Sequence, residues 1–571
     1  MSDRAASLRR VAILITALLM ACATKGATPT STSSATVSLA AAERSYQRVR
    51  ELKDAMDVAR ARGAGVVEGG DSLTVAARAY LPARSYLDSL LRGVDSAALD
   101  TVDRRALRTM RGTAANDLAA DAATAPPLDT ARPDCAYDAA TIAALPNGLD
   151  SLSRRVYACY GYAAQHVLFD GERLDRLTIL GRLPGTDSAA ERERLFRALT
   201  PVFRSVNGDD GPSSPYRQLV RLSADRWRAH GSPVDEAARA AGVDPALMER
   251  WLVSILARWR DVTADSVIEP WDYDYLGGRA DRRLDGQISA RGLRALNEEY
   301  YRALGANVDS LQVRYDLDPR EGKTPVAFTT FGRRARQVAS TWAPGDEWIF
   351  ATYRYAGLGN LNELLHESGH AVHIAAIRAR PAFLDWPDDD AFTEGLADIV
   401  ALEVYEPAWQ ARWLGDSASL ADDLRARYAG IMMDVCWSLF EIRMHAHPES
   451  DPNAVWTQLT SEYLRIRPHP ELSWWARRGQ LVDLPGYMSN YAIGAIIIAD
   501  IRARVKAEHG DFARGDPTWY AWVTPRLYRF GLARSSRQVM EDFLGRPVSP
   551  NALLADLDRL RTARAAGATR D

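Results

Sequence analysis

The sequence predicts a mainly α-helical protein with two lobes and one small β-sheet. Ala, Leu and Arg dominate long runs of helical character, whereas β patterns are confined to residues 310–355. Because 571 residues exceed the usual size of a single hydrophobic core, we expect two lobes, at 41–260 and 261–571. The clearest expected helices lie at 40–62, 74–122, 188–231, 246–263, 289–304, 417–446, 453–465 and 534–562.

Residues 1–21 have the pattern of a signal peptide. Three arginines precede an apolar stretch at 11–21 that is too short to span a bilayer. The stretch ends Leu19-Met-Ala-Cys22, which resembles a bacterial lipobox and implies a lipid on Cys22. Residues 22–40, rich in Ala, Thr and Ser, predict a flexible tether. We therefore expect an exported chain held at the periplasmic face of the outer membrane; an ordinary signal peptide with a free Cys22 is the alternative.

The composition beyond the tether is that of a soluble body. The chain is 47% hydrophobic and 25% charged with a net charge of −3, so neither nucleic acid nor an anionic membrane surface is an expected partner. A monomer is the simplest expectation. Cys135 and Cys159 could close a disulfide in an oxidising compartment or remain a thiol pair. Cys436, between Val435 and Trp437, is expected in the core.

The most informative motif is His366-Glu367-Ser-Gly-His370. We expect it on a helix capped by Asn360 and stopped by Pro381. Histidines four residues apart face the same side of a helix and can bind one Zn²⁺ together, while Glu367 can reach a water on that metal.

A third ligand is expected on the next helix, at 388–402. Its first turn is acidic, and Glu394 follows His370 by 24 residues, a distance that lets this helix return to the first one. Asp398 lies one turn beyond Glu394, where it could accept a proton from the free ring nitrogen of a ligating histidine. The alternative for Asp398 alone is a solvated helix carboxylate.

These motifs together resemble the gluzincin metallopeptidases, and the spacing to Glu394 resembles that of the angiotensin-converting enzyme family. Stretches that resemble the thimet-type oligopeptidases instead are Glu269-Pro-Trp271-Asp272-Tyr273, Asp316-Leu-Asp-Pro-Arg320-Glu-Gly322-Lys323 and Gly486-Tyr487-Met-Ser-Asn-Tyr491. The resemblance covers roughly residues 265–505. It implies a large two-lobed α-helical peptidase with a deep central cleft, one zinc ion and oligopeptide substrates.

Tyr491 is expected on a helix at 487–505, where Tyr487 shares its face. By the resemblance, Tyr491 matches the tyrosine with which both families stabilise the negative charge that develops on the former carbonyl oxygen. The alternative is a core tyrosine, since residues 493 and 496–498 nearby are apolar.

Substrate-binding residues are suggested by resemblance alone. Ala339-Ser-Thr-Trp342 resembles the edge strand that holds the substrate backbone in converting-enzyme relatives, which implicates Ala339. Arg478 lies near a family lysine that binds the substrate carboxylate, although a solvated pair with Arg477 is the alternative. Two family histidines are replaced by Val338 and Leu481, which leaves the cleavage register open.

The expected activity follows from the resemblance. Zn²⁺ on His366, His370 and Glu394 would activate a water, and Glu367 would act as the general base. A dipeptidyl carboxypeptidase and an endo-acting oligopeptidase are both compatible with these motifs. A non-catalytic lipoprotein that binds peptides or zinc is the alternative from another class, although it would have no need of Glu367. Further donors beside Tyr491 could come from His445, His447 or His469.

Overall fold

The computed structural model describes residues 38–63, 67–122, 133–135, 140, 145, 148–229, 231–320, 323, 327–353 and 356–568. The expected signal peptide, Cys22 and most of the expected tether lie outside these residues. Among the described helices, none combines the length and the apolar character that crossing a bilayer requires.

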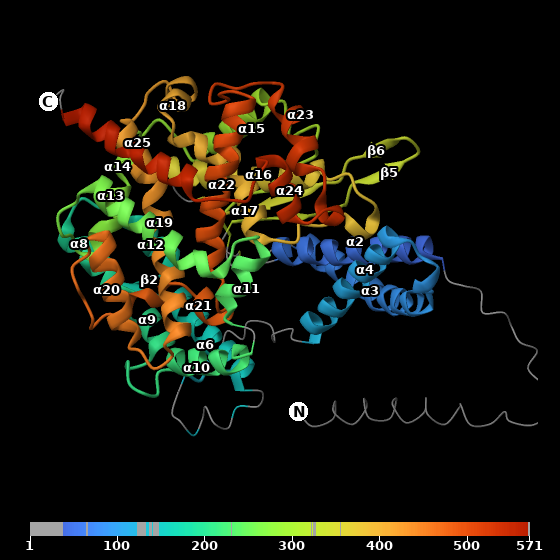
Figure 1. Ribbon diagram of the computed structural model, residues 1–571, viewed down its shortest axis with the longest axis horizontal. Helices are drawn as coiled ribbons and strands as arrows, with labels where there is room; N and C mark the ends of the chain where they lie inside the picture. Colours follow the sequence, from blue (N-terminus) through green and yellow to red (C-terminus); the bar gives the residue numbers. More distant parts are fainter. Residues whose placement is uncertain are drawn as a thin grey trace, which may run out of the picture.

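The predicted mainly α-helical fold is confirmed (Figure 1). The helices that precede the central sheet are α2 (Leu39–Gly63), α3 (Val67–Gly93), α4 (Thr101–Ala122), α6 (Gly148–Gln165), α7 (Arg176–Arg182), α8 (Ala189–Ala198), α9 (Thr200–Asn207), α10 (Pro215–Trp227), α11 (Pro233–Ala240), α12 (Pro245–Thr263), α13 (Tyr273–Gly277), α14 (Arg279–Arg283) and α15 (Gly292–Ala303). Those that follow it are α16 (Leu358–Ala376), α17 (Asp390–Ala401), α18 (Pro407–Trp413), α19 (Leu420–Ala446), α20 (Pro452–Leu464), α21 (Gln480–Asp483), α22 (Met488–Glu508), α23 (Trp519–Val523), α24 (Ser536–Leu544) and α25 (Asn551–Ala568).

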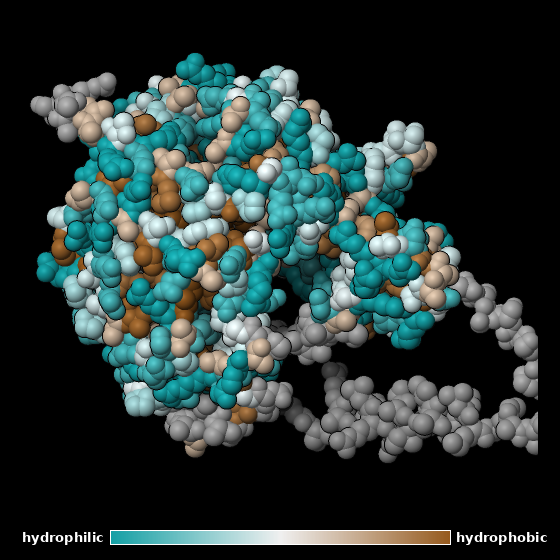
Figure 2. Space-filling view, viewed as in Figure 1, coloured by the Kyte–Doolittle hydropathy of each residue, from teal (hydrophilic) through white to brown (hydrophobic). Residues whose placement is uncertain are grey.

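Helices α2, α3 and α4 form a unit that stands out beside the main body (Figures 1 and 2). The unit has a hydrophobic core of its own, which continues into Phe331 and into the segment 374–384 that ends and follows α16. The view in Figure 2 shows a mostly hydrophilic surface on both parts. The α2–α4 unit is therefore anchored on the same stretch of chain that leaves the helix of the histidine motif.

The main body is built around one larger hydrophobic core, which extends from Leu149 to Leu560. Its long central helices are α19 and α22, both of which are buried along much of their length. The expected lobe boundary at residue 260 falls near the end of α12, and core side chains lie on both sides of it. The division into lobes at 41–260 and 261–571 remains a prediction.

A three-stranded sheet lies beside α16, where the sequence predicts it. Strand β7 (Glu347–Phe350) is central; β3 (Arg314–Asp316) pairs with it in parallel, and β4 (Phe328–Phe331) pairs antiparallel with Thr329 opposite Ile349. Strand β4 is thus an edge strand. The motif at 339–342, which resembles a substrate-binding edge strand, does not join this sheet. It lies in a separate hairpin of β5 (Arg336–Val338) and β6 (Thr341–Ala343), which projects from the body (Figure 1).

A further hairpin lies where no strand is expected from the sequence. Strands β1 (Val167–Phe169) and β2 (Glu172–Leu174) pair antiparallel and are connected by Asp170 and Gly171. The φ angles of these two residues, 50° and 83°, are those of a tight hairpin turn. The Asp-Gly pair is a hairpin signal, but the strands on either side of it are only three residues long.

The structure distinguishes between the two states that the sequence allows for the cysteine pair. Cys135 and Cys159 form a disulfide with their Cα atoms 5.9 Å apart, which ties the chain before α6 to that helix. Cys436 is a free cysteine and is fully buried, as the sequence predicts. Burial raises the pKa of its thiol far above the usual range, so it is an inert core residue.

Candidate active site

The helix of the histidine motif begins earlier than the sequence predicts. Helix α16 starts at Leu358, so Asn360 lies inside the first turn and is not its cap. The cap comes from elsewhere in the chain, because the carboxylate of Asp281 in α14 accepts a hydrogen bond from the backbone N–H of Leu358. Gly357, with a φ of 122°, allows the chain to enter the helix at this point.

Helices α16 and α17 pack very closely at Gly369, inside the motif. A Cβ at this position would lie 2.4 Å from the backbone oxygen of Ala397, so only glycine permits this approach. Helix α17 begins behind Asp389, whose carboxylate accepts a hydrogen bond of 2.7 Å from Phe392 N–H. The close contact places Glu394 of α17 directly opposite the two histidines of α16.

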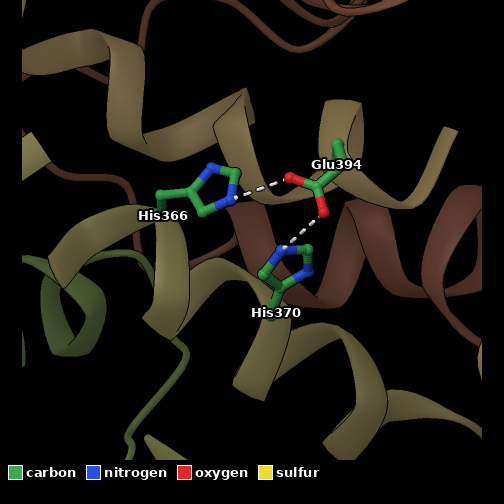
Figure 3. A group of neighbouring side chains, drawn as sticks. All are labelled: His366, His370 and Glu394. Atoms are coloured by element: carbon green, nitrogen blue, oxygen red, sulfur yellow. Dashed lines mark ion pairs between the residues drawn. The ribbon is translucent and has the colours of Figure 1, made fainter. Parts of the chain in front are cut away.

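His366, His370 and Glu394 converge as the sequence predicts (Figure 3). The Nε2 atom of His366 lies 3.2 Å from Glu394 Oε2, and Nε2 of His370 lies 3.8 Å from Oε1 of the same carboxylate. One nitrogen or oxygen atom from each of the three residues lies within 4.8 Å of the others. Two imidazoles and a carboxylate that face one point are a donor set typical of catalytic zinc.

Asp398 orients one of the two histidines by a hydrogen bond. Its Oδ1 atom lies 2.7 Å from Nδ1 of His366, which leaves Nε2 of that ring directed at Glu394. Burial alone would lower the pKa of His366, but the carboxylates of Asp398 and Glu394 raise it well above the usual range. Burial likewise opposes ionisation of Glu394, yet hydrogen bonds and charge from His366 and His370 hold its pKa well below normal.

Glu367 lies on the cavity side of α16 and is held by the sheet. Its Oε2 atom accepts a hydrogen bond of 2.7 Å from the hydroxyl of Thr329 on β4. Glu367 is 6% exposed, so it is shielded from bulk water while still lining the cavity. The sequence does not single out Thr329, which the fold brings next to the expected base.

A cavity of about 390 Å³ opens over these side chains. Its lining includes His366, Glu367, His370, Glu394 and Tyr491. The sequence does not single out three other lining residues, Phe328, Trp386 and Asp390; the ring of Trp386 lies 5.5 Å from that of His370. The structure therefore brings the expected metal ligands, the expected base and Tyr491 to one cavity.

Tyr491 reaches the cavity from α22. This helix begins at Met488, and the buried carboxylate of Glu441 accepts hydrogen bonds from the backbone N–H groups of Gly486 and Met488 at 2.7 and 3.1 Å. The phenol oxygen of Tyr491 accepts a hydrogen bond of 3.3 Å from Gln480. Burial raises the pKa of Tyr491, which keeps its hydroxyl protonated and able to donate a hydrogen bond.

The other expected substrate-binding residues lie further from the metal ligands. Tyr487 packs edge-on against Tyr491, with ring centres 5.6 Å apart, but lines a separate cavity of about 370 Å³. Arg478 lies 5.6 Å from the Tyr491 ring, and its guanidinium donates to Asp434 at 2.6 Å. Ala339 is in the turn of the β5–β6 hairpin and does not line the cavity. The strand beside the metal ligands is β4 instead.

The histidines that the sequence leaves open are not in the cavity lining. His469 is bonded on both ring nitrogens, to Glu471 at 2.7 Å and to Glu269 at 2.8 Å. His445 is largely buried, and burial lowers its pKa to about 4. His447 is exposed and lies 3.5 Å from Glu449.

Comparison with solved structures shows which fold the chain adopts. No protein-family model matches the sequence, and no curated protein sequence matches it. Among solved structures, the chain is similar to an M32 carboxypeptidase from Deinococcus radiodurans R1, with a TM-score of 0.57 and 14% identity over 92% of this chain and 99% of that one. It is also similar to a protein named CHT, with a TM-score of 0.53 and 14% identity over 91% and 99% of the two chains. Trypanosoma cruzi metallocarboxypeptidase 1 gives a TM-score of 0.49 at 14% identity, over 92% of this chain and 99% of that chain.

At this identity the likeness shows the fold alone. Over nine-tenths of its length the chain adopts the mainly α-helical fold of the M32 carboxypeptidase. The narrower resemblance of the motifs to the angiotensin-converting enzyme and thimet-type families is not confirmed.

Proposed function

We propose that the protein is a zinc-dependent peptidase that hydrolyses oligopeptides. One observation carries the proposal: the three candidate ligands, the candidate base Glu367 and the phenol of Tyr491 line the same cavity. The M32 carboxypeptidase whose fold the chain shares supports the peptidase class. A pure zinc-binding or peptide-binding protein would need neither a shielded carboxylate next to the ligands nor a phenol beside them.

The residues present fit a zinc ion. His366 and His370 each offer a ring nitrogen, Glu394 offers a carboxylate oxygen, and three protein ligands leave a fourth position open. The Nδ1 atom of His366 is hydrogen-bonded to Asp398. This bond fixes the orientation of the ring, so that its Nε2 atom is directed at the expected metal position. A bound zinc ion supplies a Lewis acid that polarises the scissile carbonyl and acidifies water.

The chain's own side chains would then carry the protons and the charge. Glu367 accepts the proton of the attacking water and passes it to the leaving amine. The Thr329 hydroxyl donates a hydrogen bond to Oε2 of Glu367, and we expect Oε1 to face the water. The Tyr491 phenol donates a hydrogen bond to the former carbonyl oxygen, where negative charge develops as the peptide bond is attacked.

The peptide backbone would lie along β4. This strand is bonded to β7 on one side only among the described strands, and Phe328 and Thr329 line the cavity. An extended peptide can add to such an edge by backbone hydrogen bonds. Strand β4 thus takes the role that the sequence motif at Ala339 suggests for residues 339–342.

The finer specificity belongs to the same proposal. We favour removal of short pieces, dipeptides among them, from a free C-terminus, because the M32 neighbour is named a carboxypeptidase. Arg478 remains the candidate cation for the terminal carboxylate, although its bond to Asp434 neutralises part of its charge. The competing activity is endo-cleavage, which needs no cation at the end of the peptide.

Paired peptides test this choice. A peptide library is digested by the purified chain with free or amidated C-termini, and the products are identified by mass spectrometry. We expect cleavage near the free C-terminus and at least a tenfold loss on amidation. Equal cleavage of both forms would establish the endopeptidase, and no cleavage of any peptide would contradict the proposal as a whole.

We further propose that the chain is exported and anchored through a lipid on Cys22, at the periplasmic face of the outer membrane. The support comes from the pattern of residues 1–21 and the composition of residues 22–40. The first described helix, α2, begins at Leu39, next to the end of the expected tether. We also propose a monomer, because the three candidate ligands meet without a residue from a second copy.

A further inference from the structure

A second cavity, here called the arginine cavity, lies between the α2–α4 unit and the main body. It measures about 380 Å³, which is within the usual range of small-molecule sites. Helix α2, the chain around β5 and β6, and the segment after α16 all contribute to its lining. Its principal lining residues are Arg50, Arg334, Arg336, Arg378, Arg380 and Trp342, and no acidic residue of the described chain is part of the lining.

Three of these arginines form ion pairs with carboxylates that do not line the cavity. Arg334 is bonded to Asp54 at 2.6 Å, and Arg50 is paired with Asp385 at 2.8 Å. Arg380 is paired with both Glu43 and Asp103, each at 2.7 Å. These carboxylates balance the positive charge of the three arginines.

The other two arginines have no such partner. Within the described part of the chain, neither Arg336 nor Arg378 forms an ion pair with a carboxylate. One nitrogen of Arg378 donates to the backbone oxygens of Ala375 and Ile377, at 2.7 and 2.9 Å, and thereby caps the end of α16. Arg336 is exposed and is not hydrogen-bonded through its side chain to any described residue. Two positive charges therefore remain at the cavity.

A flat aromatic wall completes the lining. The guanidinium carbon of Arg378 lies 5.4 Å from the centre of the Trp342 ring. The cavity thus combines two unpaired guanidinium groups with an apolar surface.

We propose that the arginine cavity binds a phosphoryl group, as inorganic phosphate or as a soluble phosphate monoester. Two unpaired guanidinium groups balance the charge of a phosphate dianion, and the planar fork of arginine matches phosphate oxygens with paired hydrogen bonds. The volume leaves room for an organic group against Trp342.

Binding there would join two parts of the protein. Arg50 belongs to the α2–α4 unit, whereas Arg336 and Arg378 belong to the body. The segment that holds Arg378 continues through Leu384 to Trp386, whose ring lies 5.5 Å from that of His370. A bound phosphate would therefore fasten the unit to the chain segment that lines the candidate active site. This site is distinct from the proposed peptidase cavity and does not depend on it.

Inorganic phosphate is the probe that tests this site. Thermal unfolding and calorimetric titration are measured on the full chain at constant pH, with sodium chloride keeping the ionic strength fixed. We expect a saturable rise in Tm with phosphate. We expect Arg336→Gln to weaken the phosphate Kd at least tenfold, and Arg336→Gln combined with Arg378→Gln to abolish binding.

Arg333→Gln is the matched control, because Arg333 is exposed, lies three positions from Arg336 and is paired with Asp346 outside the cavity. It should bind phosphate as the unaltered chain does. Arg336→Gln alone removes an exposed side chain, so it keeps the test valid if the double variant fails to fold. No saturable binding by the unaltered chain would overturn the proposal. So would binding that Arg336→Gln leaves unchanged, or that Arg333→Gln weakens equally.

Discussion

The hydroxyl of Thr329 lies 2.7 Å from Oε2 of Glu367, so the edge strand of the sheet holds the candidate base of the helix. We expect Thr329→Val, which keeps the shape and loses this hydrogen bond, to lower kcat roughly tenfold to a hundredfold. Hydrogen bonds to charged groups contribute about 1.5–3 kcal/mol. Steady-state kinetics on a cleaved peptide measure the effect.

Thr329→Ser is the matched control, because it restores the hydroxyl and removes only a methyl group. We expect near-normal kcat for this variant, with bound zinc unchanged in both. If serine and valine reduce kcat equally, Thr329 contributes packing to β4 and does not orient Glu367.

Tyr491→Phe tests the phenol at the cavity. We expect kcat to fall by roughly 10²–10³ with little change in KM, since a donor to the developing oxyanion acts mainly in the transition state. Stability should change by only about 1 kcal/mol, because the ring stays and only the bond with Gln480 is lost. A purely structural tyrosine would give the opposite result, a lower Tm with normal kcat in the folded fraction.

Asp423, on α19, gives a prediction for stability against pH. This carboxyl is fully buried, and burial, helped by the nearby Asp422 and Glu406, raises its pKa to about 7. The folded state therefore binds the proton more tightly than the unfolded state does. The contribution of this proton to the free energy of unfolding is fully present below about pH 4 and is lost as the pH rises through about 7. The loss amounts to at most about 4 kcal/mol.

Asp423→Asn removes this titration. The Tm of the variant relative to the unaltered chain should rise between pH 5 and pH 8, even if the amide lowers Tm by a constant amount. Thermal unfolding at a series of pH values provides the measurement, with the exposed Asp261→Asn as control. A constant difference across the series would show that Asp423 is ionised throughout.

Cys22→Ser tests the proposed anchor. We expect the variant to lose lipid attachment and to leave the detergent phase on phase partitioning, because serine offers no thiol for acylation. Peptidase activity should be unaffected, since the described chain begins its first helix only at Leu39. Unchanged partitioning of the variant would contradict lipidation at Cys22.

The parts of the site that the sequence predicts are those fixed by local spacing. His366 and His370 share a face because they are four residues apart on a helix, and Glu394 and Asp398 share one for the same reason. Gly369 also lies within the motif, although its role in the contact with Ala397 is visible only once α17 is placed.

The parts that the sequence misses depend on contacts between distant segments. Asp281 caps α16 from 77 residues away, and Thr329 on strand β4 reaches Glu367 on helix α16. The prediction that the motif at Ala339 forms an edge strand beside the site is wrong for a local reason. Ala339 adopts a φ of 52° in a two-residue turn, a conformation usually signalled by Gly or Asn, so the expected single strand is a hairpin that projects from the body.

Metal content and peptide hydrolysis, measured on the same preparations of the unaltered chain and of Glu367→Gln, test the central claim most directly. The account predicts about one zinc per chain in both proteins, loss of hydrolysis on chelation, and recovery when zinc is restored. It predicts at least a hundredfold loss of kcat in Glu367→Gln, because the amide keeps the shape of the base and cannot accept the water's proton. Normal hydrolysis by zinc-loaded Glu367→Gln, or an unaltered chain that binds no zinc, would contradict it.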